Sequence, residues 1–494
     1  MKPGLTSTTI RRLTYCALGA GLVLVALSIG LDDQQRTVAY PALAVILVLA
    51  TLVAVLSGRD HAIPYFDIGV VCTFVTAVYL AFPPLAFLLS GLEWTVLSDG
   101  RLLRYQVSPP EFSAITWWGA LYIFSLASTY SVTRQRPAAD FTVRLREPSK
   151  AAIVGLVFFF ALVLIYSQML QSVLGVNLNP TYGSEDLTID SESVPLLLQQ
   201  ITDKVLGIGV VLQFGLILLL VNRAHNHVFR WTLYIWAGAL TVTLLTTFGA
   251  RSQLAFFLLA WLLAHERLRP RFGVPKAVVF GILLVLALLF YGFARDMRDA
   301  SVEPHLIFSA ITDFQALYGT TYEVMRIRDT VASADLPLTL YLADFFRLFP
   351  QQILPFEKVD PAGWYLDTAG LRGLGGYNFG VLSEAAIGLG AIELVARGMV
   401  LGFLLGYIHN WYVKRAAGFW PTLFYLWLCV LSYYTFRAST FYLLTHALYV
   451  FLPAYLLVTI ASSVLTWKQR TLKSGQRDNG AGLTFPVSEK LHKG

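Results

Sequence analysis

The sequence predicts an all-α fold, a polytopic integral membrane helical bundle of about twelve transmembrane helices with a large, mostly helical outer loop. Of the 494 residues, 56% are hydrophobic and only 14% are charged, whereas soluble domains carry roughly a quarter charged residues. Apolar runs long enough to cross about 30 Å of hydrocarbon recur along the chain. The stretch 295–376 interrupts them, and it is mixed in charge and rich in aromatic residues.

The apolar runs give the expected positions of the membrane spans. The run at 252–265 is short and is the least well defined. The expected spans lie near 14–31, 39–57, 66–90, 113–131, 150–170, 204–222, 231–248, 252–265, 276–293, 391–412, 419–436 and 441–466.

Basic residues indicate how these spans are oriented. Because an excess of Lys and Arg marks the cytoplasmic side, we expect both termini inside and the large loop outside. The net charge of +7 then reflects topology and gives no support to nucleic-acid binding, since it is not clustered on one soluble face. Lys and Arg gather in the N-terminus and in alternate connections, at 134–150, 223–230, 267–276, 414–415 and from 468 onward.

These features divide the chain into four parts. An N-terminal transmembrane bundle is expected over 1–294, and an outer loop or cap with amphipathic helices over 295–376. The C-terminal transmembrane helices follow over 377–467, and a basic cytoplasmic tail without fixed structure over 468–494.

The outer loop carries helical periodicity of its own. Apolar residues recur at near-helical spacing from Phe308 to Val331, which predicts one helix there. A second, amphipathic helix is predicted over 338–349, ending at Pro350. Its stripe suits the membrane interface, a lipid tail or packing on the bundle. The stripe consists of Leu338, Tyr341, Leu342, Phe345, Phe346 and Phe349.

A glycine-dense run at 370–380 leads from the loop into a late apolar segment. Asn378 stands where a dinucleotide-binding GxGxxG pattern would need its third glycine, and no predicted strand precedes the run. We therefore expect these glycines to allow a close backbone approach or a flexible start to the next helix.

Arginines at the expected outer face are candidates for binding a diphosphate. A guanidinium is always charged, and its planar fork can hold two phosphate oxygens at once. The alternative is that each arginine reaches the lipid headgroups or pairs with a loop carboxylate. The candidates are Arg251 and Arg437 at short hairpin tips, with Arg347, Arg372, Arg295 and Arg298.

Glu384 is the leading candidate for proton transfer. It lies in an otherwise apolar stretch, where a carboxylate must be protonated, paired or hydrated. It either takes part in chemistry or forms a salt bridge that only holds the fold. His305 is a second catalytic candidate, and His446 also lies near the outer face. Neither the spacing of His nor that of acidic residues predicts a metal site, and the cysteines, all in apolar segments, predict no disulfide framework.

Several of these motifs resemble the bacterial oligosaccharide repeat-unit polymerases, the Wzy type that builds O-antigen and capsular chains. Gly249-Ala250-Arg251-Ser252 resembles their arginine-bearing hairpin, and Phe345-Phe346-Arg347-Leu348-Phe349-Pro350 is similar to their loop motif. The glycine run, Ser383-Glu384 and Gly388-Leu389-Gly390 are similar to their glycine-rich approach to a late helix. The resemblance covers roughly 245–440 in order and spacing, with Val359 where a second loop proline is common; the first half is similar only as a multi-span bundle.

The resemblance implies a GT-C-like membrane glycosyltransferase of the bacterial inner membrane. Its donor and acceptor would be oligosaccharides on undecaprenyl diphosphate, with membrane lipids around it and a chain-length regulator as a further partner. The C1–O bond to diphosphate is already activated, so no cofactor and no metal are expected. Arginines would stabilise the leaving diphosphate, and a carboxylate or His would take the acceptor proton.

Two other functions remain open from the sequence. An O-antigen ligase, which transfers polymer to lipid A core, would share the long outer loop and the arginines, with His305 as its available loop histidine. A transporter for lipid-linked sugars would instead favour charges in mid-bilayer and inverted repeats.

Overall fold

The computed structural model describes the backbone of residues 5–57, 67–89, 95–97, 104–106, 109–134, 145–174, 196–223, 251–268, 312–330, 338–369, 379–416, 418–432 and 434–480. These residues are helical apart from turns, short irregular segments and one small hairpin, so the predicted helical class is confirmed. In that hairpin β1 (Thr95–Leu97) pairs antiparallel with β2 (Arg104–Gln106).

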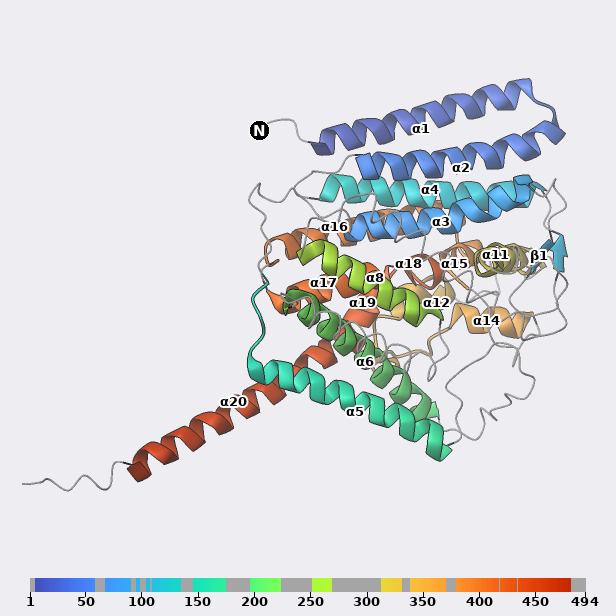
Figure 1. Ribbon diagram of the computed structural model, residues 1–494. Helices are drawn as coiled ribbons and strands as arrows, with labels where there is room; N and C mark the ends of the chain where they lie inside the picture. The colour runs from blue at the N-terminus through green and yellow to red at the C-terminus, as the bar shows by residue number, and fades with distance from the viewer. Residues whose placement is uncertain are drawn as a thin grey trace, which may run out of the picture.

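The first four helices lie side by side along one flank of the molecule (Figure 1). They are α1 (Leu5–Gly30), α2 (Asp33–Ser57), α3 (Ile68–Leu89) and α4 (Pro109–Thr133). On the opposite flank lie α5 (Lys150–Leu174), α6 (Leu196–Arg223) and α20 (Leu452–Gly480), with α8 (Arg251–Leu268) and α17 (Phe419–Leu431) between the flanks.

The long helix α16 (Ala391–Val413) packs directly on α4 because it presents a row of glycines. A Cβ added at Gly398 would lie 2.6 Å from Tyr122 O, and one added at Gly402 would lie 2.4 Å from Leu126 O. This spacing of small residues lets two backbones approach closely, as in many membrane helix pairs. The pair fixes the position of every side chain on the inner face of α16.

Four helical segments are long and apolar enough to cross a membrane, within the residues that the structure describes. They are Gln35–Leu56, Ile68–Leu85, Ala391–Val413 and Tyr442–Trp467, and shorter apolar helices cover Arg12–Ser28, Lys150–Tyr166, Gly207–Asn222 and Phe419–Leu431. The expected span at 113–131 is helical, as part of α4. Those at 231–248 and 276–293 lie outside the described residues.

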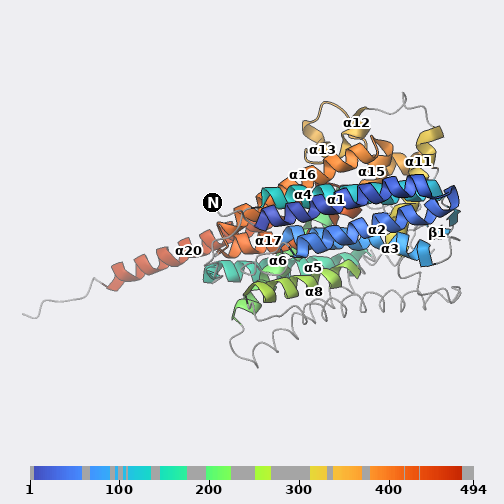
Figure 2. The same ribbon diagram turned by 90° about the horizontal axis from the view of Figure 1, so that it is seen from above.

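The described part of the predicted outer loop contains several helices, joined over 347–360 by turns and irregular segments. It contains α11 (Thr312–Thr330), α12 (Leu338–Tyr341), α13 (Ala343–Phe346) and α14 (Pro361–Thr368), followed by α15 (Val381–Ile387). Figures 1 and 2 both place these helices at the end of the bundle away from the C-terminal end of α20. One face of α11 is buried in the bundle, because Leu317, Thr320 and Thr321 are fully buried and the helix packs on α3, α4 and α15.

Two predicted boundaries differ from the structure. The single helix expected over 338–349 is two short helices, because Leu342 between them has φ −102° and ψ 9°, outside the helical range. The last helix, α20, runs to Gly480, so the first part of the basic tail expected from 468 onward is helical.

Candidate functional site

The candidate site is built on α15, the short helix that carries Glu384. All seven of its residues are buried. It begins at Gly380, where a Cβ would lie only 2.7 Å from Phe436 O and 3.0 Å from Arg437 O. A glycine is needed there because the backbone passes against α18 (Tyr434–Arg437). The close approach expected of the glycine run is thus present at its last residue.

A tight turn then reverses the chain from α15 into α16. Gly390 has φ +63°, a conformation that residues with a side chain rarely adopt. The side chain of Glu393 closes the turn by accepting a hydrogen bond from Leu389 N at 2.9 Å. One helical turn further, Arg397 Nη2 lies 2.7 Å from Glu393 Oε1, so the turn and the arginine are held together.

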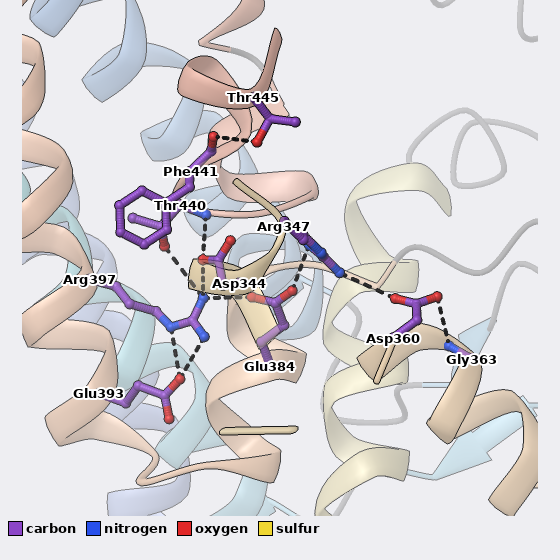
Figure 3. A network of polar contacts seen from close by, with 10 residues as sticks. All are labelled: Asp344, Arg347, Asp360, Gly363, Glu384, Glu393, Arg397, Thr440, Phe441 and Thr445. Atoms are coloured by element: carbon purple, nitrogen blue, oxygen red, sulfur yellow. Dashed lines mark hydrogen bonds and ion pairs between the residues drawn. The ribbon is translucent and has the colours of Figure 1, made fainter. Parts of the chain in front are cut away.

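Arg397 is the centre of a buried ionic network (Figure 3). Its Nη1 donates to Glu384 Oε2 at 2.6 Å and to Asp344 Oδ2 at 2.7 Å. The side chain of Arg397 is 13% exposed, and those of Glu384 and Asp344 are 2% and 5% exposed. Buried charges are tolerated when they are paired and hydrogen-bonded, and each charge here has at least one such partner.

Arg347 reaches Glu384 from the opposite side (Figure 3). Its Nη1 lies 3.0 Å from Glu384 Oε1, and its Nη2 lies 3.4 Å from Asp360 Oδ1. The Arg347 side chain is 32% exposed, so it joins the buried carboxylate to solvent. Asp360 is itself fixed, because its other oxygen accepts from Gly363 N and caps α14.

The electrostatic balance of the network is acidic. Two guanidiniums, Arg347 and Arg397, face four carboxylates, those of Asp344, Asp360, Glu384 and Glu393. Burial raises the pKa of Glu384 to about 7, and Asp344 acts in the same direction, whereas Arg397 and Arg347 lower it. The carboxylates around Arg347 outweigh the effect of its burial and raise its pKa above the usual range. Glu384 can therefore exchange a proton near neutral pH while both arginines stay charged.

Aromatic side chains lie next to the network in the sequence, between Asp344 and Arg347 and directly after Thr440. Phe345 packs edge-on against Phe441 at 6.2 Å between centroids, and Phe346 packs against Phe356 at 4.9 Å. Phe345 is 45% exposed and Ile353, at the tip of the following loop, is 64% exposed. The predicted aromatic stripe thus partly packs on the bundle and partly presents apolar surface beside Arg347.

The structure brings together some of the predicted site residues. Glu384 and Arg347 are in direct contact, and the backbone of Arg437 lies against the start of α15. Arg251 is the first residue of α8, but its side chain lies outside the described residues, as do Arg295, Arg298, His305 and Arg372 entirely. His446 is stacked on Tyr442 at 3.9 Å, and its Nδ1 lies 3.2 Å from the carbonyl oxygen of that residue.

Sequence reasoning missed Arg397 and Asp344. Arg397 lies in the apolar run 391–412, and the rule that marks an ionisable residue within a span as a functional candidate would have found it. Asp344 gave no comparable signal, because an acidic residue on the polar face of an amphipathic helix is ordinary.

A second buried polar network ties the helices together about 18 Å further along α16, twelve residues beyond Arg397. Asp67 caps α3 by accepting from Val70 N at 2.8 Å and pairs with Arg134 at 3.1 Å. His409 Nδ1 lies 2.8 Å from the Tyr425 hydroxyl, which accepts from Ile68 N at 2.9 Å. These contacts join α3, α4, α16 and α17. None of the contacts is predicted by the pattern of the sequence.

Comparisons of this chain with family models, with curated proteins and with solved structures find no match. Among the described residues, no group of three or more His, Cys, Asp or Glu side chains is placed to hold a metal ion. What the network can do is therefore argued from its geometry: a paired, buried carboxylate beside a half-exposed guanidinium can exchange a proton and bind an anion at neighbouring atoms.

Proposed function

We propose that the protein is a membrane glycosyltransferase that polymerises oligosaccharide repeat units carried on undecaprenyl diphosphate. The observation that carries this proposal is that Glu384 is buried between Arg397 and the partly exposed Arg347, which follows the exposed Phe345 in the chain. Polymerisation of such units needs a proton acceptor, fixed positive charge for a diphosphate and apolar surface for a lipid tail. The resemblance of the loop motifs to repeat-unit polymerases points to the same chemistry.

The two oxygens of Glu384 have different roles in this proposal. Oε2 is occupied by Arg397, whereas Oε1 makes no hydrogen bond, although Arg347 Nη1 lies nearby. Oε1 is thus the atom that can take the proton of an acceptor hydroxyl. The acceptor oxygen forms the new bond to C1 of the donor sugar as the C1–O bond to diphosphate breaks, and the diphosphate leaves with the electron pair.

The leaving diphosphate needs more positive charge than the network supplies. Within the described residues, Arg347 Nη2 contacts an exposed aspartate, Asp360, at 3.4 Å, and a phosphate oxygen can replace that partner. Because carboxylates outnumber guanidiniums in the network, we assign a share of the diphosphate to Arg437, whose backbone borders α15. From the sequence, Arg251, Arg295, Arg298 and Arg372 are further candidates for this role, and His305 for proton transfer.

We further propose a bundle of about twelve spans with the Glu384 network on the outer side of a bacterial inner membrane and both termini cytoplasmic. Two basic connections support this orientation. Arg146, in 134–150, forms a backbone bridge with Gly418, which follows Lys414 and Arg415. Both connections therefore lie together at the end of α16 remote from Glu384.

A reconstitution assay tests the proposed reaction. Purified protein in vesicles receives one fluorescent lipid-linked repeat unit, and products are separated by electrophoresis. We expect a ladder of chain lengths from the wild type and single units from Glu384→Gln at matched folding and matched donor binding. Asp329→Asn, an exposed carboxylate on α11, serves as the control and should retain the ladder.

The same assay separates the alternatives. With lipid A core added to the vesicles as a second acceptor, transfer of one unit to that core without a ladder would replace the polymerase by a ligase. Protection of the fluorescent unit from a membrane-impermeant quencher, without any new bond, would replace it by a transporter. A normal ladder from well-folded Glu384→Gln would remove Glu384 from the reaction.

A further inference from the structure

Two buried carboxylates share one nitrogen atom in the outer network. Arg397 Nη1 lies 2.6 Å from Glu384 Oε2 and 2.7 Å from Asp344 Oδ2. The two residues are 40 positions apart and come from α15 and α13, so their meeting is a product of the fold. Figure 3 shows both side chains converging on the end of the arginine.

Asp344 is held firmly in this position. Its Oδ2 also accepts a hydrogen bond from Thr440 N at 3.0 Å, and the residue is 4% exposed. Its Oδ1, like Oε1 of Glu384, is buried without a hydrogen bond. The pair therefore consists of two carboxylates joined through a single guanidinium nitrogen, each with a second oxygen that makes no hydrogen bond within the described residues, and that of Glu384 lies 3.0 Å from Arg347 Nη1.

We propose that Asp344 is a positioning residue for Glu384. Its negative charge competes with Glu384 for Arg397, and this competition keeps Glu384 able to take up and release a proton. This inference rests on the proposed polymerisation, because the proton that Glu384 takes up is the one that the hydroxyl of the acceptor sugar releases. After transfer, Glu384 Oε1 carries this proton and must lose it to water before the next acceptor arrives.

The physical reason is competition for a single positive charge. An opposite charge at hydrogen-bond distance lowers the pKa of a carboxyl by about 1–3 units, and a like charge raises it. With Arg397 to itself, Glu384 would be a weak proton acceptor. With Asp344 on the same nitrogen, part of the stabilisation of the ionised form is removed, and burial removes more. A base is most effective when its pKa lies near the working pH.

Glu384 pairs with Arg397 and Arg347, further charged or titratable residues lie on the helices packed against α15, and all of them are left unchanged by a substitution at Asp344. The helices packed against α15 supply Arg397 and Glu393 from α16, Arg328 from α11, Arg437 from α18 and Tyr122 from α4, and Arg347 follows α13. Arg328 donates to the backbone oxygen of Ala386 rather than to Glu384.

The test is to titrate Glu384 in Asp344→Asn by infrared difference spectroscopy of the carboxyl stretch, with Glu384→Gln assigning the band. The whole purified protein is used, so this readout does not depend on activity. We expect the Glu384 band to titrate about one pH unit lower than in the wild type, since a like charge has been removed. Asp344→Glu, which keeps the charge, should restore the wild-type value, and Asp329→Asn should not move it. If Asp344→Asn does not accumulate, the smaller neutral Asp344→Ser carries the same expectation.

An unchanged titration in a folded neutral variant would overturn the role of Asp344, and so would an equal shift in Asp344→Glu and Asp344→Asn. A shift of the band in a protein that makes no polymer would keep the inference and remove the proposed function. In variants that form polymer, the acidic limb of the pH profile of polymer formation should shift together with the infrared band of Glu384. A purely structural role of Asp344 would not cause this shift.

Discussion

Arg397 reaches back across the turn 388–390 and places Nη1 2.6 Å from Oε2 of Glu384, joining the two helices that the turn separates. The same nitrogen holds Asp344, and Nη2 holds Glu393. One arginine in an apolar helix thus pairs with carboxylates from three different segments. Removing it would leave buried negative charges facing one another.

We expect Arg397→Ala to lose about 3–5 kcal/mol of folding stability, because buried carboxylates would be left without their partner. Unfolding of the detergent-purified protein, followed by tryptophan fluorescence at pH 8, measures this loss. Arg397→Lys should recover only part of it, since an ammonium group cannot hold Glu384, Asp344 and Glu393 with a planar fork. An Arg397→Ala protein as stable as the wild type would show that the network contributes little to the fold.

Substitution of Arg347 should affect activity far more than stability. Its side chain is 32% exposed and its contact with Asp360 is exposed, so solvent screens much of its charge. If Nη2 binds the diphosphate, Arg347→Ala should reduce polymer formation by about 10²-fold. Arg347→Lys should be nearly as impaired, because lysine lacks the bidentate fork.

Rates from the vesicle assay and unfolding midpoints from the same preparations separate the two effects. A large drop in the unfolding midpoint with normal turnover would assign Arg347 to the fold instead of to the substrate.

Sequence reasoning found Glu384 because a lone carboxylate in an apolar stretch is conspicuous on its own. It could not find the partners in the same way. Asp344 and Arg397 are 53 positions apart, and their contact depends on how α13 lies over the start of α16. Arg347 was singled out as an anion ligand, but the structure shows first that it pairs with Glu384 and Asp360. Periodicity predicts that helices exist, whereas long-range packing decides which side chains meet.

The helical class of the chain could be predicted because periodicity is a local property of the sequence. Apolar runs and helical spacing predicted α2, α3, α16 and α17 within a few residues. The division of 338–349 at Leu342 was not predictable from the apolar stripe, which continues through the break. The polar contacts of Asp67 with Arg134 likewise require the packing of α3 on α4.

Gly390→Ala should disturb the network without touching any charge. Gly390 has φ +63°, and a Cβ there would lie 3.2 Å from the ring of Trp118. We expect a loss of about 1–3 kcal/mol in stability from the strained backbone. We also expect reduced polymer formation, because the turn sets the direction in which Arg397 approaches Glu384.

Gly19→Ala is the matched control, since a Cβ at Gly19 meets nothing within 4 Å in helix α1. It should be neutral or slightly stabilising. Equal effects of the two substitutions on unfolding and turnover would contradict a special role for the turn.

The raised pKa of Glu384 predicts opposite pH dependences for activity and stability. Because the ionised form accepts the proton, polymer formation should fall as pH decreases through about 7. The sign for stability is reversed. A carboxyl whose pKa is higher in the folded state than in the unfolded state contributes stability that is fully present below the unfolded value of about 4.3 and is lost as pH rises through the folded value.

Turnover and unfolding midpoints measured from pH 5 to 8 in steps of about half a unit check both slopes. In Glu384→Gln the contribution of this group to each profile should vanish. An acidic limb that persists unchanged in residual activity of Glu384→Gln would assign it to another group.

The proposed orientation predicts which exposed positions can be labelled from each side of the membrane. Ile353, 64% exposed beside the network, should react in Ile353→Cys with a membrane-impermeant maleimide added to intact bacterial cells with a permeabilised outer membrane. Lys414→Cys, at the exposed C-terminal end of α16 that the proposed orientation places in the cytoplasm, should react only after the inner membrane is opened. Cys72 and Cys429 are buried and can stay, whereas Cys16 is only half-buried and is replaced by Ser in both variants. The reverse labelling pattern would invert the bundle and place Glu384 on the cytoplasmic side, where an acceptor presented outside could not reach it.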